Sequence, residues 1–453
     1  MPKSLFAPTA LLPEGWAQNV LVEFDRSGII TKVHVGASAP QDAVQCQGPV
    51  IPGMPNLHSH AFQRAMAGLA EVALNPEDSF WTWRDVMYRL VGRLTPDQVE
   101  DIARYLYIDM LKAGYTAVAE FHYLHHDSDG RPYADPAEMS RRVLRAAERA
   151  GIGMTLLPVL YAHGGFGGRP PSDGQKRFIH STDGYLKLQE TLAKDCQGPG
   201  RRLGFCFHSL RAVTLEQIKE VLGSSADDRP VHVHIAEQQK EVDDCLAWSA
   251  LRPIEWLYDN VAVDGRWCLI HATHAEANEV TAMVTSGAVA GLCPTTEANL
   301  GDGLFPAVDF AAAGGRFGIG SDSHVSLSVV EELRWLEYGQ RLKHERRNRL
   351  HDANKHVAGY LYRSALAGGA QALGQNMGRI SVGSRADLVV LDGQHPLLAH
   401  VEKDDILGRW LFAGLNRMVK DVMVGGDWVV QDGRHADEIE AGRAFAAAVK
   451  AAI

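Results

Sequence analysis

The chain has 453 residues, of which 46% are hydrophobic and 22% are charged, so its composition excludes an intrinsically disordered protein. Its formal net charge of −10 argues against nucleic acid as a partner, because binding to phosphate needs a basic surface. No run approaches the roughly 20 apolar residues that cross a membrane, so we expect no membrane partner.

The two ends of the chain show residue patterns typical of β-strands. Residues 1–49 contain short strand patterns with a turn at 25–28 and no helical period. Residues 378–453 again contain strand patterns, with a turn at 425–426, and end in a helical pattern from about residue 438. Neither segment is long enough to form a good core alone. We therefore predict that the two segments pair into one small β-sandwich domain.

Residues 50–377 alternate short apolar runs with long helical patterns, which is typical of βαβ units and a parallel sheet. The apolar runs number eight: 50–57, 115–122, 153–161, 202–208, 230–235, 267–271, 288–293 and 316–320. Thr95 followed by Gln98, and Ser328 followed by Glu331, have the spacing of capping boxes at helix starts. The pattern predicts the α/β class and, within it, a (β/α)₈ TIM-like barrel.

Histidines and one aspartate follow the apolar runs at the end where barrel enzymes place their chemistry. In His58-x-His60 the two residues are two apart on a strand, so both imidazoles point to the same side. Alone, this pair could cap a turn or pack in the core. With His234 after the fifth run and Asp322 after the eighth, it forms three imidazoles and a carboxylate. We predict that these four residues bind one divalent metal ion, with Zn²⁺ as the expected ion.

Two further polar residues at the strand ends are predicted to be catalytic together with Asp322. Glu237, three residues after His234, could move protons near the metal, or it could simply complement the dipole of the next helix. His271 ends the sixth run and could polarise a substrate or serve a structural role. Asp322 could accept a proton from an attacking water molecule as well as bind the metal.

These residues carry a resemblance to the amidohydrolase superfamily that runs over nearly the whole chain. The H-x-H pair, the His-x-x-Glu of the fifth strand, the later histidine and aspartate, and the segments GSRADLVVLD and VMVGGDWVVQDG all match. The fourth run, RLGFCFHSLR, lacks the lysine that bridges two metals in part of that superfamily. The resemblance therefore implies the one-metal deaminase branch.

Within that branch, the segments HSHAFQRAM, SFWTWRDVMY, AEFHYLHH, FHSLRAV, HIAEQ and LCPTTEANLGDG resemble enzymes that release ammonia from a linear amidine bearing two carboxylates. The implied partner is thus a small-molecule substrate with two carboxylates, and an acidic protein needs guanidinium donors to hold it. The predicted substrate-binding residues are Gln63, Arg84, Tyr123, His208 and Arg211. Trp83 is expected to pack in the core or at a subunit contact, and the habit of the superfamily implies a homodimer.

Three alternatives remain open at the level of sequence. The first is another deaminase of the same branch that acts on an amino-substituted ring, for which aromatic stacking would replace paired arginines. The second is a ring-opening hydrolase such as imidazolonepropionase, which releases no ammonia. The third is a metal-binding module without activity. The six cysteines are scattered without a Cys-x-x-Cys pair, and no secretory signal is recognised, so we expect a cytoplasmic protein.

Overall fold

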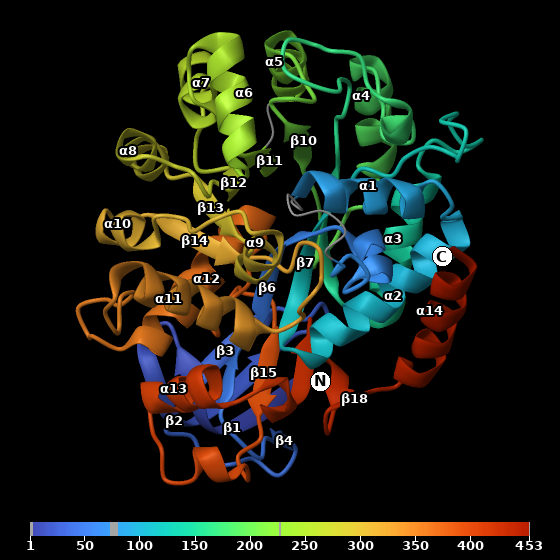
Figure 1. Cartoon of the computed structure of the whole chain (residues 1–453). Helices are drawn as coiled ribbons and strands as arrows, with labels where there is room; N and C mark the ends of the chain where they lie inside the picture. The colour runs from blue at the N-terminus through green and yellow to red at the C-terminus, as the bar shows by residue number, and fades with distance from the viewer. Residues whose placement is uncertain (1–2, 73–79, 226–227, 453) are drawn as a thin grey trace.

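A computed structural model describes residues 3–72, 80–225 and 228–452. Figure 1 shows parallel strands at the centre, helices around them, and the strands of both chain ends gathered at one end of the molecule. The α/β class predicted from the alternating pattern is confirmed.

The central strands form two parallel sheets that meet at both edges. The first sheet contains β6 (Met54–Ser59), β7 (Tyr115–His122), β8 (Gly153–Pro158) and β9 (Arg201–Leu203). The second contains β10 (Phe205–Ser209), β11 (Val231–Ile235), β12 (Trp267–His271), β13 (Val289–Leu292) and β14 (Arg316–Ile319). Parallel bridges join Ser59 to Asp322 at one seam and Leu160 to Phe207 at the other. The strands therefore close into a ring, as in a β/α barrel.

Helices connect and cover these strands. They are η1 (Ala61–Met66), α1 (Phe80–Val91), α2 (Pro96–Lys112), α3 (Glu138–Ala150), η2 (Asp173–Gln175), α4 (Thr182–Leu192), α5 (Leu215–Gly223), α6 (Gln239–Ser249), α7 (Pro253–Asn260), α8 (Ala277–Ser286), α9 (Pro294–Leu300), α10 (Ala307–Ala312), α11 (Val329–His344) and α12 (Val357–Leu373). The capping box at Thr95 is confirmed, because Gln98 N–H donates to its hydroxyl and its own N–H donates to Gln98 Oε1. At Ser328 only half of the expected box forms, since the Glu331 carboxylate accepts from Ser326 instead.

The chain ends form one continuous nine-stranded sheet, where a sandwich of two sheets was expected. Its strands are β1 (Lys3–Leu12), β2 (Gly15–Phe24), β3 (Ile30–Val35), β4 (Val44–Gln45), β5 (Val50–Pro52), β15 (Leu388–Leu391), β16 (Val419–Val424), β17 (Asp427–Gln431) and β18 (Arg434–His435). The strand β5 joins the two halves, because it pairs with β1 on one side and with β15 on the other. The remaining elements of this end are η3 (Pro396–Leu398), α13 (Asp404–Ala413), η4 (Asn416–Met418) and α14 (Glu438–Ala452).

The predicted first barrel strand, 50–57, is therefore divided between two sheets. Its first three residues lie in the terminal sheet, and the barrel strand begins at Met54. The chain changes sheets at Gly53, where a Cβ atom would lie 2.2 Å from the Thr116 side chain. The close approach of the two segments requires a residue without a side chain at this position.

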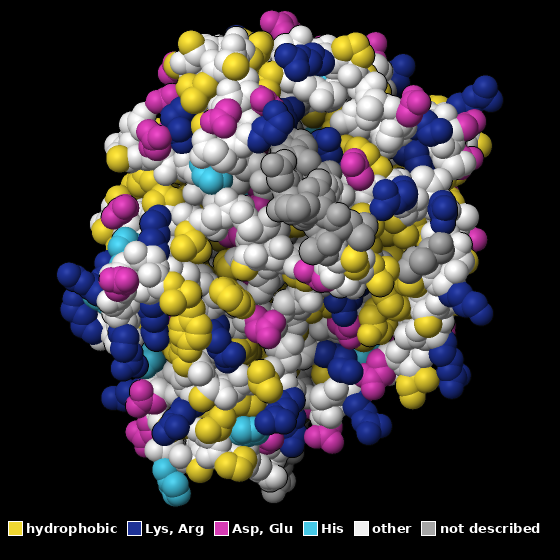
Figure 2. Space-filling view, in the orientation of Figure 1, with side chains coloured by type: hydrophobic (Ala, Val, Ile, Leu, Met, Phe, Trp, Pro, Cys, Tyr) yellow, Lys and Arg dark blue, Asp and Glu magenta, His cyan; other side chains and the backbone are white. Residues whose placement is uncertain are grey.

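The terminal sheet packs against the barrel through alternate side chains of β15. Leu388 and Val390 belong to the apolar cluster of the terminal sheet, whereas Val389 and Leu391 belong to the barrel core. This alternation is the period of two that a strand buried on both faces requires. On the face in Figure 2, basic and acidic side chains are interspersed. Within the described residues, every helix is too short or too polar to traverse a bilayer.

Candidate active site

The backbone is strained where the predicted site residues follow their strands. The φ angle is 69° at His271, at the end of β12, and 44° at Asp322, after β14. Ala236, directly after β11, has a φ of 49°. Residues other than glycine rarely adopt this left-handed conformation, which costs about 1–3 kcal/mol each, and it persists where the surroundings hold it for function. The strained residues mark this end of the barrel as the candidate site.

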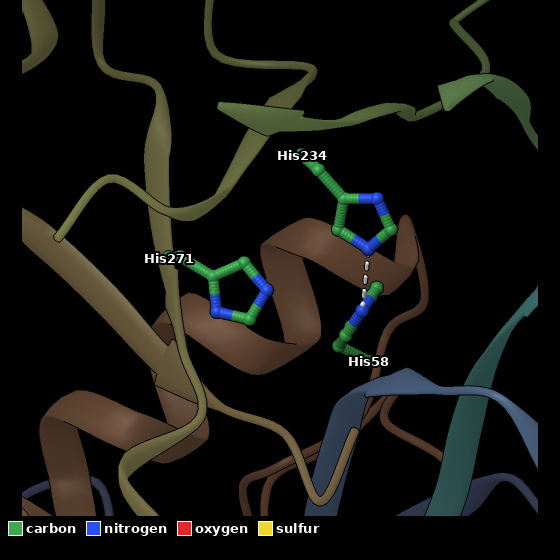
Figure 3. Close-up of side chains that lie close together, drawn as sticks. All are labelled: His58, His234 and His271. Carbon is green, nitrogen blue, oxygen red and sulfur yellow. Dashed lines mark hydrogen bonds between the residues drawn. The ribbon is translucent and has the colours of Figure 1, made fainter. Parts of the chain in front are cut away.

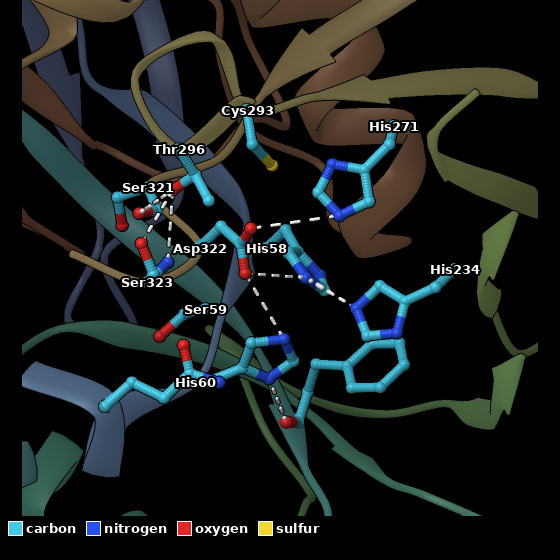
Figure 4. A network of polar contacts seen from close by, with 12 residues as sticks. His58, Ser59, His60, His234, His271, Cys293, Thr296, Ser321, Asp322 and Ser323 are labelled. Atoms are coloured by element: carbon cyan, nitrogen blue, oxygen red, sulfur yellow. Dashed lines mark hydrogen bonds and ion pairs between the residues drawn. The ribbon is translucent and has the colours of Figure 1, made fainter. Parts of the chain in front are cut away.

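The four predicted metal ligands lie together at this end. His58 Nε2 is 3.0 Å from His234 Nε2, and Figure 3 shows these imidazoles facing each other beside His271. Asp322 Oδ1 lies 3.4 Å from His58 Nε2 and 3.3 Å from His60 Nε2 (Figure 4). All four side chains are buried, so donor atoms from β6 and the residue after it, from β11 and from the segment after β14 converge on one point.

The protonation states of these groups suit a cation. His60 Nδ1 is 2.9 Å from the carbonyl oxygen of Phe121, so this nitrogen carries the proton and Nε2 keeps its lone pair. Burial, together with the neighbouring His60, lowers the pKa of His58 to about 3. Burial also holds the pKa of His234 well below its usual value. Neutral imidazoles beside a carboxylate are a donor set for a divalent ion such as zinc, so the residues present fit the metal.

Glu237 and His271 lie beside this cluster. Glu237 Oε1 is 3.8 Å from His271 Nε2, which is also 3.8 Å from Asp322 Oδ2. Burial raises the pKa of Glu237 to about 7, which suits a group that exchanges protons near neutral pH. On its other side, His271 Nδ1 lies 3.2 Å from Glu297 Oε1. Burial alone would lower the pKa of His271, but Glu237 and the other carboxylates around it raise the value to about 10.

Glu241, and not Glu237, is the acidic residue in the first turn of the helix that follows β11. The helix α6 begins at Gln239, and Glu241 in its first turn is the residue whose carboxylate accepts hydrogen bonds from backbone N–H groups. Its carboxylate accepts from Ala236 N–H at 3.3 Å and from Glu237 N–H at 3.2 Å. Its Oε2 also lies 3.8 Å from Arg211 Nη2. Glu241 thus leaves the Glu237 carboxylate to face the cluster, and it links the backbone of Glu237 to Arg211.

A cleft with about 690 Å³ of empty volume opens over these residues. Its lining includes His60, His234, Glu237, His271 and Asp322. The same cleft is lined by all the predicted substrate-binding residues, namely Gln63 on η1, Arg84 on α1, Tyr123 after β7, His208 on β10 and Arg211 after β10. The guanidinium groups of Arg84 and Arg211 give the cleft hydrogen-bond donors for carboxylates.

Several cleft or support residues were not predicted from the sequence. Trp83 packs against the hydrophobic core, as expected, and it also lines the cleft, which was not predicted. Tyr161 and Gln175 also line it, and the Gln175 amide donates to the Tyr161 hydroxyl at 2.7 Å. Glu297 contacts His271 from α9. Trp83 and Glu297 lie in segments that carry the family resemblance, and Gln175 completes a capping box with Ser172, but none of these patterns indicates a place in the cleft. The rule that strand ends carry the chemistry could have flagged Tyr161, which follows β8 closely.

Comparisons with known proteins give one consistent result. The sequence model described as the amidohydrolase family matches residues 50–429. The formimidoylglutamate deiminase of Pseudomonas aeruginosa PAO1 is 66% identical over 443 residues, which is 98% of this chain and 98% of that protein. A 5-methylthioadenosine/S-adenosylhomocysteine deaminase of Natronomonas pharaonis is 28% identical over 87% of this chain and 84% of its own length. The crystal structure of an amidohydrolase from Brucella melitensis superposes with a TM-score of 0.93, at 48% identity and 99% coverage of both chains.

Proposed function

The chain belongs to the amidohydrolase family, and on that premise we propose that it hydrolyses N-formimino-L-glutamate to N-formyl-L-glutamate and ammonia. One observation carries the proposal. A single cleft brings two arginines, Arg84 and Arg211, together with Glu237 and with donor atoms for a metal ion. A substrate with two carboxylates and a formimino group needs both kinds of partner. The likeness to the Pseudomonas deiminase supports the same substrate.

The amidohydrolase family uses a metal, and we propose that one divalent ion, zinc first, is held by His58, His60, His234 and Asp322. The donor atoms of His58, His60 and Asp322 lie within 4.8 Å of one another, as do those of His58, His234 and His271. When bound, such an ion supplies Lewis acidity that lowers the pKa of a coordinated water molecule to about 7.

Arg84 and Arg211 hold the two carboxylates of the substrate, and Gln63, Tyr123 and His208 offer further polar contacts in the cleft. The amide of Gln63 donates to the hydroxyl of Tyr123 at 2.9 Å, which fixes both side chains in place. Bidentate guanidinium groups suit carboxylates in shape and charge, so the arginines fix the orientation of the substrate. The formimino carbon is thereby directed toward the carboxylates at the base of the cleft.

The proton transfers follow from the positions of the acidic groups. Asp322 accepts a proton from the attacking water as the new C–O bond forms. Glu237 donates a proton to the formimino nitrogen as the C=N bond becomes a single bond. Asp322 then passes the proton that it took from water to the same nitrogen, so that the C–N bond breaks with neutral ammonia as the leaving group. The hydroxyl proton of the tetrahedral centre returns to Glu237, which restores an ionised Asp322 and a protonated Glu237. His271 donates a hydrogen bond to the oxygen on which negative charge develops.

An ammonia-release assay tests the proposal. N-formimino-L-glutamate, guanine and imidazolone propionate are each offered to the metal-loaded enzyme, and Glu237→Gln serves as the control for a contaminating activity. We expect ammonia from N-formimino-L-glutamate alone. Ammonia from guanine alone would indicate a ring deaminase, and ring opening of imidazolone propionate without ammonia would indicate a ring-opening hydrolase. Absence of any turnover in metal-loaded protein would favour the inactive binding module.

The pathway, the cellular compartment and the oligomeric state are also proposals. We place the activity in histidine degradation in the cytoplasm, and we propose that the chain acts as a homodimer. All six cysteines are free and buried, which suits a reducing compartment. Sedimentation equilibrium of the purified protein measures the oligomeric state directly, and a monomer at micromolar concentration would contradict the dimer.

A further inference from the structure

One wall of the cleft is built from three segments that are distant in the sequence. The helix α1 contributes Trp83 and Arg84, the turn after β7 contributes Tyr123, and the segment around η2 contributes Gln175 and Phe178. None of these segments is a barrel strand, so the strand ladder does not fix their relative positions. A separate set of contacts must hold them together.

Arg177, between the two cleft residues of the η2 segment, makes these contacts. Its side chain is buried, and residue exposure is only 1%. Nε donates to the carbonyl oxygen of His126 at 2.8 Å, Nη1 donates to the carbonyl oxygens of Val91 and, at 3.0 Å, Leu94, and Nη2 donates to the hydroxyl of Tyr133 at 3.3 Å. The acceptors lie on all three sides of the planar guanidinium group.

The charge of Arg177 has no conventional partner. Among the residues that the structure describes, no carboxylate oxygen lies within 4.0 Å of the guanidinium group, and its four acceptors are neutral. Asp127 reaches the group only through Tyr133, whose hydroxyl donates to Asp127 Oδ1 at 3.5 Å. A buried cation without a carboxylate in direct contact is costly, so the groups that it does contact must account for its position. The position of its acceptors supplies that reason.

Val91 is the last residue of α1, and Leu94 follows three residues later. The last carbonyls of a helix have no partner within the helix, and the helix dipole makes this end partly negative. A guanidinium group placed there satisfies those carbonyls and complements the dipole. In the opposite direction, the carbonyl oxygen of Arg177 accepts from His125 N–H and His126 N–H, both at 3.0 Å. Arg177 therefore ties α1 and the turn after β7 to the η2 segment.

We propose that Arg177 is a positioning residue that sets α1 against the cleft and so places Arg84 for a substrate carboxylate. This inference rests on the proposed function, in which Arg84 binds the substrate. A lysine cannot replace the residue, because a single ammonium group does not reach acceptors on three sides. The inference also separates Arg177 from the reaction itself, since its side chain does not line the cleft.

Kinetics of Arg177→Met, Arg177→Lys and Arg177→Gln test the role. A misplaced binding group costs up to about 100-fold, so we expect KM for N-formimino-L-glutamate to rise by about that factor while kcat changes little. Arg177→Lys should not rescue KM. In an Arg84→Met background, Arg177→Met should raise KM little further, because the contact through which it acts is already gone. An unchanged KM, rescue by lysine, or fully additive losses would overturn the proposal.

A matched control separates positioning from general stability. Arg104 is also a buried arginine, 2% exposed, but it pairs with Asp437, just before α14, and with Glu440 on α14, and it does not line the cleft. Arg104→Met should lower the melting temperature without the rise in KM. If Arg177→Met does not fold, the lysine and glutamine variants carry the kinetic test. A rise in KM for Arg104→Met equal to that for Arg177→Met would refute the specific role.

Hydrogen exchange tests the same inference without turnover. In Arg177→Met, the amides of residues 80–91 should exchange faster than in the wild type, whereas those of α2 should not change. If the wild type fails to hydrolyse N-formimino-L-glutamate, the proposed function fails and this measurement still decides the anchoring of α1. Unchanged exchange over residues 80–91 would show that Arg177 does not hold the helix.

Discussion

Replacing Glu241 by glutamine should impair both stability and turnover, although its side chain does not line the cleft. The carboxylate is fully buried and accepts hydrogen bonds from the backbone N–H groups of Ala236 and Glu237. Arg211 Nη2 lies 3.8 Å from it. An amide of the same shape has one acceptor oxygen, so one of the two N–H groups meets an NH₂ group instead. A buried N–H without an acceptor costs about 1–3 kcal/mol, which sets the expected loss in the free energy of unfolding.

The loss of activity should exceed what this loss of stability explains. Both the backbone of Glu237 and the guanidinium group of Arg211 depend on Glu241, so the proposed proton donor and one carboxylate-binding group move together. A displacement of about 1 Å at reacting groups costs up to about 100-fold in rate. We therefore expect kcat/KM for ammonia release from N-formimino-L-glutamate to fall by about 10- to 100-fold at temperatures where the variant is fully folded.

Glu337 provides a matched control on α11. Its carboxylate is fully buried, accepts from Arg349 N–H and Leu350 N–H at 2.9 Å each, and contacts Arg341 Nε at 2.7 Å. Glu337→Gln should therefore lose stability to a similar extent, as measured by urea denaturation, and keep its kcat/KM. Equal kcat/KM for the two variants would refute the argument that Glu241 acts on the site.

The other predictions concern the metal, the catalytic groups and pH. Glu237→Gln should lower kcat at least about 100-fold with an unchanged metal content, and near-normal turnover would exclude its role as proton donor. Arg211→Met should lower kcat/KM by about 10- to 150-fold, mainly through KM, because a charged hydrogen bond contributes about 1.5–3 kcal/mol; a loss confined to kcat would contradict this. Dialysis against a chelator should abolish activity, Zn²⁺ should restore it, and His58→Ala should copurify with less metal by plasma mass spectrometry; full activity after metal removal would contradict the site. Burial lowers the pKa of His180 to about 3 in the folded chain. As the pH falls below 6.5, this imidazole is protonated in the unfolded chain but not in the folded chain, so the folded chain loses stability. His180→Gln should remove about 3 kcal/mol of that loss by pH 4, and identical urea midpoints at pH 4 and pH 7 in the wild type would exclude the effect.

The arrangement of the candidate ligands was predictable because it follows from two general rules. Alternation along a strand places His58 and His60 on one side, and the carboxyl ends of parallel strands share one end of a barrel. These rules need only the identity and order of the strands, which the apolar runs indicate. They therefore place His234 and Asp322 beside the H-x-H pair, even though the chain separates Asp322 from His60 by more than 260 residues.

The sheet to which a strand belongs was harder to predict. Residues 50–52 and 54–57 read as one apolar run, because a strand in the terminal sheet and a buried barrel strand have the same hydropathy. The change of sheet depends on Gly53 and its close approach to Thr116, a contact between segments that no local pattern encodes. The same limit applies to Trp83, whose position in the cleft depends on where α1 is anchored.

The residues that support the site share a property that hides them from sequence analysis. Glu241 accepts from backbone N–H groups, and Arg177 donates mainly to backbone carbonyls. Every residue type except proline supplies both backbone groups, so the partner positions carry no characteristic side chain and no spacing to recognise. A metal site built from side chains has a recognisable signature, whereas the groups that orient Glu237 and α1 are specified by where the backbone passes. For this reason the variants at Glu241 and Arg177 test the structure more directly than variants of the histidine cluster.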